Sequence, residues 1–201
     1  VLPLLLSLRQ QRLGKVSTAS MRLAYFAALG IGFMLVEIPL LQRFGLYMGH
    51  PTWSLSIVLG SLLLGAGCGG FATGRVTDER VSRVLHIVIA AILAVLLLLH
   101  LSLPALLQET LRWSFLARAV LTAMVLVPVG VALGTALPLG VRLLHGSHPQ
   151  LVPWAWGVNG VTSVLASVLA IVIGMTGGFA LALLVGVGCY LLAGLLARRL
   201  A

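Results

Sequence analysis

Six long apolar stretches, separated by short loops, fill almost all of this 201-residue chain and constrain its fold more than any other feature. A hydrocarbon layer about 30 Å thick requires roughly 20 apolar residues in each helix that crosses it. Windows of that length predict spans at Leu23–Met48, Trp53–Thr73, Val84–Leu107, Phe115–Leu144, Val152–Met175 and Phe179–Leu196. Because these segments are apolar on every face, we predict α-helices and an all-α, polytopic membrane protein.

The composition excludes most other classes of protein. Apolar residues make up 60% of the chain and charged residues only 8%, which a soluble domain could not tolerate on its surface. The acids are limited to Glu37, Asp78, Glu79 and Glu109. No pair of carboxylates suited to catalysis, metal-ligand spacing, phosphate loop or dinucleotide fingerprint occurs. We therefore predict no catalytic residue, no metal and no cofactor.

Positive charges concentrate in alternate loops. Those on one predicted side of the membrane are Arg9, Arg12, Lys15, Arg22, Arg75, Arg80, Arg83, Arg142, Arg198 and Arg199. The other side receives Arg43, Arg112 and Arg118, so the positive-inside rule predicts that both termini are cytoplasmic. Cations that face anionic lipid also account for the formal charge of +9, and no nucleic-acid partner is needed to explain it.

The chain divides into three predicted parts. Residues 1–7 are apolar and begin without Met, which we interpret as the end of a preceding apolar helix. Residues 8–22 are basic and are predicted to form a cytoplasmic linker. The six-helix transmembrane domain is predicted over residues 23–199.

Glu37 is the most informative single residue, because a carboxylate near the middle of a span is costly unless it is paired or neutral. We expect its side chain to face the bundle interior, protonated or hydrogen-bonded to another helix. Arg43 lies six residues away on a different helix face, so Asn159 and, less favoured, His100 are the candidate partners. Either Glu37 forms a structural hydrogen bond, or it serves transport or a proton relay.

Three prolines inside the spans are candidate helix breaks. Pro39 follows Glu37 by two residues, and Pro128 and Pro138 lie in the fourth predicted span. Proline removes a backbone donor and clashes with the preceding turn, so these sites predict broken helices of the kind that line a cavity. Kinks satisfied by neighbouring helices are the alternative. Asn159 lies deep in the fifth span, where its amide must find a partner.

Small residues and one charged loop predict helix contacts. The small-xxx-small pairs Gly65/Gly69 and Gly130/Gly134 indicate tight packing within the bundle, in preference to a dimer face. The loop after the second span carries Asp78, in a glycine, acid and arginine order that resembles the loop of major-facilitator transporters. In those transporters an acid at a helix end pairs with arginines of a neighbouring helix. We favour the simpler interpretation, in which Asp78 is a helix N-cap.

Three segments together resemble one family, the bacterial integral-membrane spermidine synthase-like proteins, in their C-terminal membrane region. The segments are Gly30–Phe44 (GIGFMLVEIPLLQRF) with Gly49–Pro51, Ala136–Leu144 (ALPLGVRLL) and Pro153–Ser167 (PWAWGVNGVTSVLAS). In that family the membrane region accompanies a soluble aminopropyltransferase-like domain that uses decarboxylated S-adenosylmethionine and a polyamine. No position in this chain matches the catalytic residues of that domain, so none is transferred.

The resemblance implies a non-catalytic membrane domain in the bacterial inner membrane. Its expected roles are to anchor a soluble synthase-like domain or another partner at the cytoplasmic face and to pass a small solute. Two alternatives stay open. The chain is either an accessory or scaffold subunit among other membrane subunits, or half of a facilitator-type transporter. Convergence of Glu37, Asn159 and the fourth helix on one hydrated cavity would favour transport over a scaffold.

Overall fold

The computed structural model describes the backbone of residues 2–200 and the side chains of residues 19–200. In this part of the chain the fold is all-α, with six helices long and apolar enough to cross a membrane. They are α1 (Leu2–Met48), α2 (Pro51–Thr73), α3 (Val81–Thr110), α4 (Phe115–Ser147), α5 (Val152–Gly177) and α6 (Phe179–Ala197). Short 3-10 turns, η1 (Asp78–Arg80) and η2 (Pro149–Leu151), precede α3 and α5. The predicted polytopic helical bundle is confirmed.

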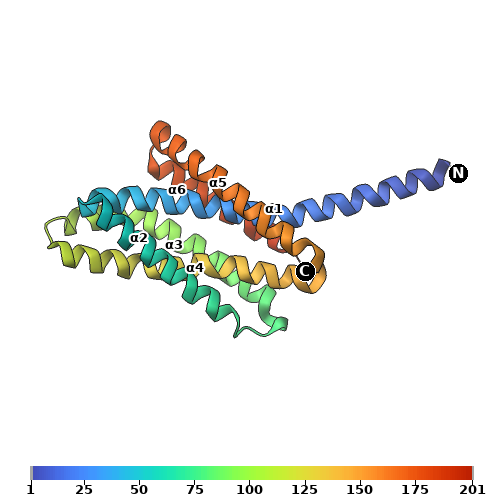
Figure 1. Cartoon of the computed structure of the whole chain (residues 1–201), viewed down its shortest axis with the longest axis horizontal. Coiled ribbons are helices and arrows are strands. Elements are labelled where there is room, and N and C mark those ends of the chain that lie inside the picture. Colours follow the sequence, from blue (N-terminus) through green and yellow to red (C-terminus); the bar gives the residue numbers. More distant parts are fainter. Residues whose placement is uncertain (1, 201) are drawn as a thin grey trace.

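Helix α1 is longer than predicted, because it begins at Leu2 and shows no end near residues 7 or 22. Among the residues whose side chains are described, Ala19–Met48 of α1 is long and apolar enough to cross a membrane. Residues 8–22, predicted as a linker, are rich in Leu, Gln, Arg and Lys, which all favour helix. The linker is therefore part of α1, and the N-terminal part of this helix extends beyond the other helices (Figure 1).

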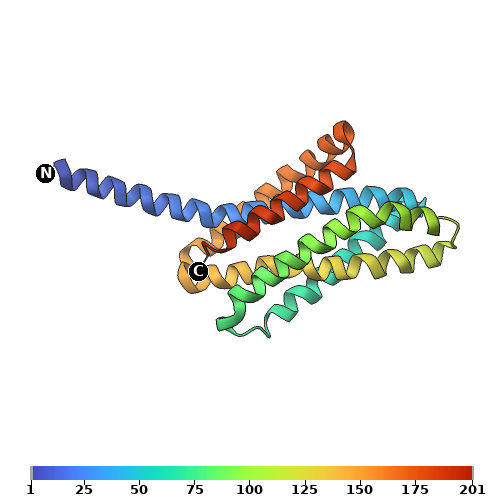
Figure 2. The ribbon, with the colours of Figure 1, turned by 180° about the vertical axis from the view of Figure 1, so that it is seen from behind.

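The bundle is built around α1, which packs most extensively against α5 and α6. The other large contact joins α2 to α4, and α3 packs against both α4 and α6. Figures 1 and 2 show the α5–α6 hairpin inclined away from the layer that contains α2 and α4. Two turns require glycine, because Gly49 (φ 73°) and Gly178 (φ 85°) adopt left-handed conformations after α1 and α5.

Close packing of α2 on α4 depends on the predicted glycine pairs. A methyl group added to Gly65 would lie 3.0 Å from Cα of Gly130, and one added to Gly130 would lie 3.1 Å from Cα of Gly65. One added to Gly134 would collide with the backbone of Ala66. The backbones can approach only because these positions carry no side chain. The interpretation of these pairs as packing within one bundle is confirmed.

The predicted helix breaks are wrong. Helix α1 continues through Pro39, and α4 continues through both Pro128 and Pro138. Each proline removes one intrahelical hydrogen bond, whereas ending the helix in lipid would leave several backbone groups without partners. A continuous helix is therefore the less costly arrangement at all three sites.

Candidate functional site: a cavity inside the bundle

Arginine side chains donate hydrogen bonds to backbone carbonyl oxygens at the ends of neighbouring helices. We call the end of the bundle with Arg22 and Arg142 the basic end, and the opposite end the far end. Arg142 of α4 donates hydrogen bonds to the carbonyl oxygens of Thr73 (2.7 Å) and Val76 (2.8 Å), and it forms an ion pair with Asp78. It thus satisfies backbone carbonyls at the end of α2, where the helix dipole is negative.

This contact corrects the predicted role of Asp78. The N-cap of η1 is Thr77, that of α3 is Arg80, and neither receives a side-chain capping hydrogen bond. Asp78 instead pairs with Arg142 on a neighbouring helix, as in the alternative that the loop pattern suggested. The carboxylate oxygen is the charged acceptor that the guanidinium prefers, so the ion pair outweighs a weak local cap.

Two further arginines make equivalent contacts. Arg22 of α1 donates to the carbonyl oxygen of Arg199 (3.0 Å), just beyond the end of α6, and also lies 3.0 Å from Nε2 of His148. At the far end, Arg118 of α4 donates to the carbonyl oxygen of Tyr47 (2.5 Å), in the last turn of α1. Three helix ends are therefore each bound by an arginine from another helix, which fixes the frame around the cavity.

A cavity of about 400 Å³ lies inside this frame, between α1, α2, α4, α5 and α6. We call it the central cavity. It is lined by Leu29, Phe33, Met34, Ala66, Gly70, Leu133, Gly134, Leu137, Pro138, Asn159, Ser163 and Tyr190. No charged residue lines it, and the polar side chains in its wall are Asn159, Ser163 and Tyr190. A mostly apolar wall with a few polar groups is the usual character of a small-molecule site.

The polar side of the central cavity comes from α5. The Nδ2 atom of Asn159 donates to the carbonyl oxygen of Phe26 on α1 (3.1 Å), and Ser163 donates to the carbonyl oxygen of Asn159 (2.8 Å). Gly30 makes this arrangement possible, because a methyl group there would lie 2.5 Å from the Asn159 carbonyl oxygen. The prediction that Asn159 finds a partner in the bundle is confirmed, but that partner is a backbone carbonyl and not Glu37.

Helix α4 also lines the central cavity, through Gly134 and Pro138. Pro138 lacks the N–H group that would bond the carbonyl oxygen of Gly134, four residues earlier. That carbonyl oxygen lies near Gly70 of α2, since a methyl group built on Gly70 would lie 3.7 Å from it. The proline therefore does not break α4, but it removes one hydrogen bond from the part of the helix that lines the cavity.

Glu37 is buried within the bundle, with 8% of its surface exposed. Its predicted position in the interior is confirmed. Among residues 19–200, however, no hydrogen bond or ion pair joins Glu37 to Asn159, to His100 or to Arg43. His100 Nδ1 and Arg43 Nη1 are themselves buried without hydrogen-bond partners in the described residues. The expected contact to another helix is therefore not present.

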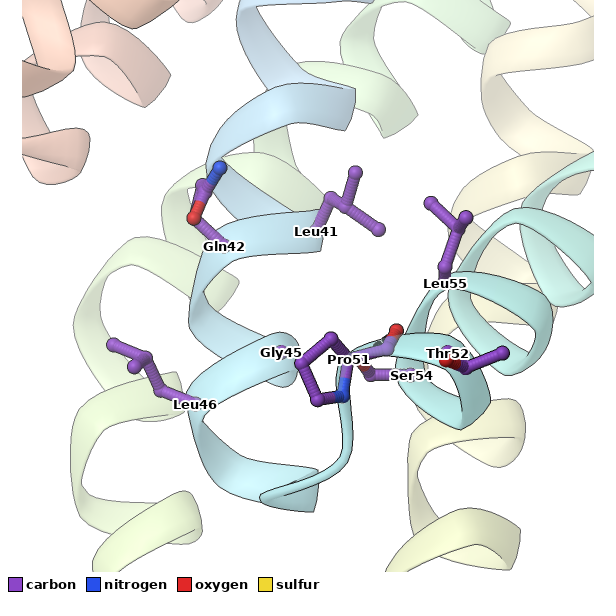
Figure 3. A pocket seen from close by; sticks show the side chains of 8 residues that line it. All are labelled: Leu41, Gln42, Gly45, Leu46, Pro51, Thr52, Ser54 and Leu55. Atoms are coloured by element: carbon purple, nitrogen blue, oxygen red, sulfur yellow. Dashed lines mark hydrogen bonds between the residues drawn. The ribbon is translucent and has the colours of Figure 1, made fainter.

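A second cavity, of about 500 Å³, opens between α1 and α2 near the far end (Figure 3). We call it the outer groove. Its lining residues are Leu41, Gln42, Gly45 and Leu46 from α1, and Pro51, Thr52, Ser54 and Leu55 from α2. Figure 3 shows the two helices on opposite sides of the groove, joined by the turn before Pro51. Its wall is also mainly apolar.

Glu37 lies between the two cavities along α1. Met34 lines the central cavity and Leu41 lines the outer groove. Residues 34, 37 and 41 are spaced by three and four positions, which places them on one face of a helix. Glu37 therefore lies on the stretch of α1 between the two cavities and is in the lining of neither.

Comparison with models of protein families, with curated proteins and with solved structures finds no match to this chain. The resemblance to spermidine synthase-like proteins therefore stays a prediction. Among the described residues, no group of three His, Cys, Asp or Glu side chains is placed to hold a metal ion. What the fold defines is a six-helix membrane bundle with a partly open cavity between five of its helices.

Several contributors to this site were not identified as site residues in the sequence. Tyr190 and Phe33 line the central cavity, but an aromatic residue within an apolar span carries no local sign of that role. Ser163 lies within the segment Pro153–Ser167 and was not identified as a site residue. The relation between Pro138 and Gly134 could have been found, because the freed carbonyl always lies four residues before the proline.

Proposed function

We propose that this chain is a non-catalytic membrane domain that admits a small amphipathic solute to the central cavity. The observation that carries the proposal is that the side chains of Asn159, Ser163 and Tyr190 line one otherwise apolar cavity. An apolar wall would hold the body of the solute, and these groups would orient its polar part.

The second part of the proposal concerns passage of the solute. Glu37 lies between the central cavity and the outer groove, and no partner in the described residues satisfies its carboxyl. Ionisable groups inside membrane spans commonly mark ion or substrate pathways. We assign Glu37 the role of exchanging a proton or binding a cationic group as solute moves between the cavities.

The resemblance to spermidine synthase-like proteins adds an anchoring role to this proposal. In that setting the domain would hold a soluble synthase-like domain or another partner at the cytoplasmic face of a bacterial inner membrane. The straight N-terminal extension of α1 beyond the bundle is suited to such a connection (Figure 1). Putrescine and spermidine, the amines that the resemblance implies for the whole protein, are the probe solutes to test first.

A first prediction concerns orientation, with the basic end placed in the cytoplasm because of its excess of cations. In a background without Cys68 and Cys189, single cysteines are introduced as Ser82→Cys near the basic end and Gln108→Cys near the far end. A membrane-impermeant maleimide added to intact cells should label only the second. Labelling of the first alone would reverse the proposed topology.

A second prediction tests whether the central cavity admits water and solute. In the same background, Ser163→Cys should react with a small cationic methanethiosulfonate reagent added to membranes, because position 163 lines the cavity. Putrescine or spermidine should slow this reaction by occupying the same space. The rate is measured by mass spectrometry of the purified protein.

The matched control is Val164→Cys, one residue further along α5, at a position with 69% of its surface exposed that does not line the cavity. In a bilayer this position faces lipid, so the charged reagent should leave it unlabelled. Equal and slow labelling at both positions would indicate a dry bundle. That result would favour the scaffold alternative, in which the helices only pack against other membrane subunits.

A further inference from the structure

A third cavity, of about 290 Å³, lies at the far end, away from the proposed solute path. It is formed where α1 ends and where α2 and α4 begin. We call it the far-end pocket, and it is lined by Met48, Gly49, His50, Trp53, Phe115 and Arg118. Unlike the central cavity, its wall contains a guanidinium and an imidazole group.

The pocket has an aromatic wall at one side. The ring of Phe115 meets the ring of His50 edge-on at 6.1 Å between centroids, and that of Trp53 at 6.3 Å. Trp53 nevertheless leaves 60% of its surface exposed at the end of a membrane span. Tryptophan at this position is typical of the layer where lipid headgroups meet the hydrocarbon.

Arg118 supplies positive charge to the pocket. One guanidinium nitrogen, Nη1, is occupied by the carbonyl oxygen of Tyr47, and the guanidinium lies 5.5 Å from the centre of the Tyr47 ring. The Nε atom is buried and has no hydrogen-bond partner among the described residues. Within residues 19–200 the one ion pair joins Arg142 to Asp78, so no carboxylate neutralises Arg118. A buried donor without a partner is costly, which indicates a missing acceptor.

The surrounding backbone also favours an anion. Helix α2 begins at Pro51 and α4 at Phe115, so the positive ends of two helix dipoles meet at this pocket. The negative end of α1 also lies here, and Arg118 binds its Tyr47 carbonyl oxygen. The side chain of His50 makes no capping hydrogen bond and is free to contact a ligand. The acid on this end of the bundle, Glu109, is exposed and forms no ion pair with Arg118.

We infer that the far-end pocket binds a phosphate group, held by Arg118 and His50 against the wall formed by Trp53 and Phe115. A phosphate offers several charged acceptor oxygens, which match a guanidinium N–H, an imidazole and nearby helix starts. Its source is either the headgroup of an anionic phospholipid or free inorganic phosphate. This site does not depend on the proposed function of the central cavity, because the two share no lining residue.

Fluorescence of Trp53 distinguishes the two sources. Replacing the other tryptophans by phenylalanine (Trp113→Phe, Trp154→Phe and Trp156→Phe) leaves Trp53 as the sole tryptophan of the full chain in nanodiscs. Brominated phosphatidylglycerol should then quench Trp53 more effectively than matched brominated phosphatidylcholine, and should reach the same quenching at a concentration roughly threefold or more lower. The reason is that the choline cation of phosphatidylcholine opposes the charge of Arg118. Inorganic phosphate added to unbrominated phosphatidylcholine discs should change the emission only if free phosphate is the ligand.

Two variants connect the signal to the pocket. Arg118→Gln should remove the preference for phosphatidylglycerol or the response to phosphate. Arg118→Gln would also remove the hydrogen bond from Arg118 to the end of α1, so a second variant is needed. His50→Gln breaks no hydrogen bond of the described residues and should weaken the same signal. Arg112→Gln, an exposed arginine at the same end outside the pocket, should preserve it. Quenching that is equal for both lipids, with no response to phosphate, would overturn the inference.

Discussion

Replacing Gly134 by leucine is expected to separate α2 from α4 and to destabilise the bundle strongly. Even a methyl group at this position collides with the backbone of Ala66, which cannot move aside as a flexible side chain could. We expect a loss of about 3 kcal/mol or more, because overpacking here displaces a whole helix. Thermal unfolding in detergent measures the effect.

Gly67→Leu is the matched control for this prediction. Gly67 also lies within a span, on α2, but a methyl group built there meets nothing within 4 Å. Leucine at this exposed position should change the stability by no more than about 0.5 kcal/mol. Gly134→Ala should fall between the two, since it adds the clashing atom but no branched side chain. Equal melting temperatures for Gly134→Leu and Gly67→Leu would contradict the close contact of α2 and α4.

Much of the fold could be predicted because only a few backbone arrangements can span a lipid bilayer. Length and apolarity alone located the six spans, and α2 ends at Thr73 and α4 begins at Phe115, as predicted. Glycine spacing also predicted close helix packing within the bundle, because the absence of a side chain is visible in the sequence, but it did not predict that α2 and α4 are the helices that meet. The predicted helix breaks at the prolines were wrong because of the same constraint from the bilayer. In lipid, a continuous helix satisfies more backbone groups than an interrupted one.

The partners of the polar side chains could not be predicted in the same way. Asp78 pairs with Arg142, 64 positions further along the chain. Asn159 binds the backbone of Phe26, a group that every residue carries and no sequence pattern marks. Such pairs depend on how α1, α4 and α5 are rotated about their axes. That rotation is set by packing of the whole bundle, and a pattern within one helix does not determine it.

The last prediction concerns Glu37, a buried residue that forms no hydrogen bond or ion pair among the described residues. Glu37→Leu should raise the free energy of unfolding, because it replaces a carboxyl group without a protein partner by an apolar side chain inside the bundle. The same substitution should abolish uptake of putrescine and spermidine into proteoliposomes. Glu37→Gln keeps the shape and polarity of the side chain. It should leave the melting temperature nearly unchanged but still abolish uptake, since an amide neither exchanges a proton nor pairs with a cation.

Glu109→Gln provides the control for charge, because Glu109 is exposed on α3 and lines none of the three cavities described above. It should change neither stability nor uptake. If Glu37 only packs the bundle through a hydrogen bond, Glu37→Leu should instead lower the melting temperature, and Glu37→Gln should transport as the natural protein does. That pattern would remove Glu37 from the proposed solute path. It would leave the central cavity as a binding site alone, because Asn159 and Ser163 form its polar side without any contribution from Glu37.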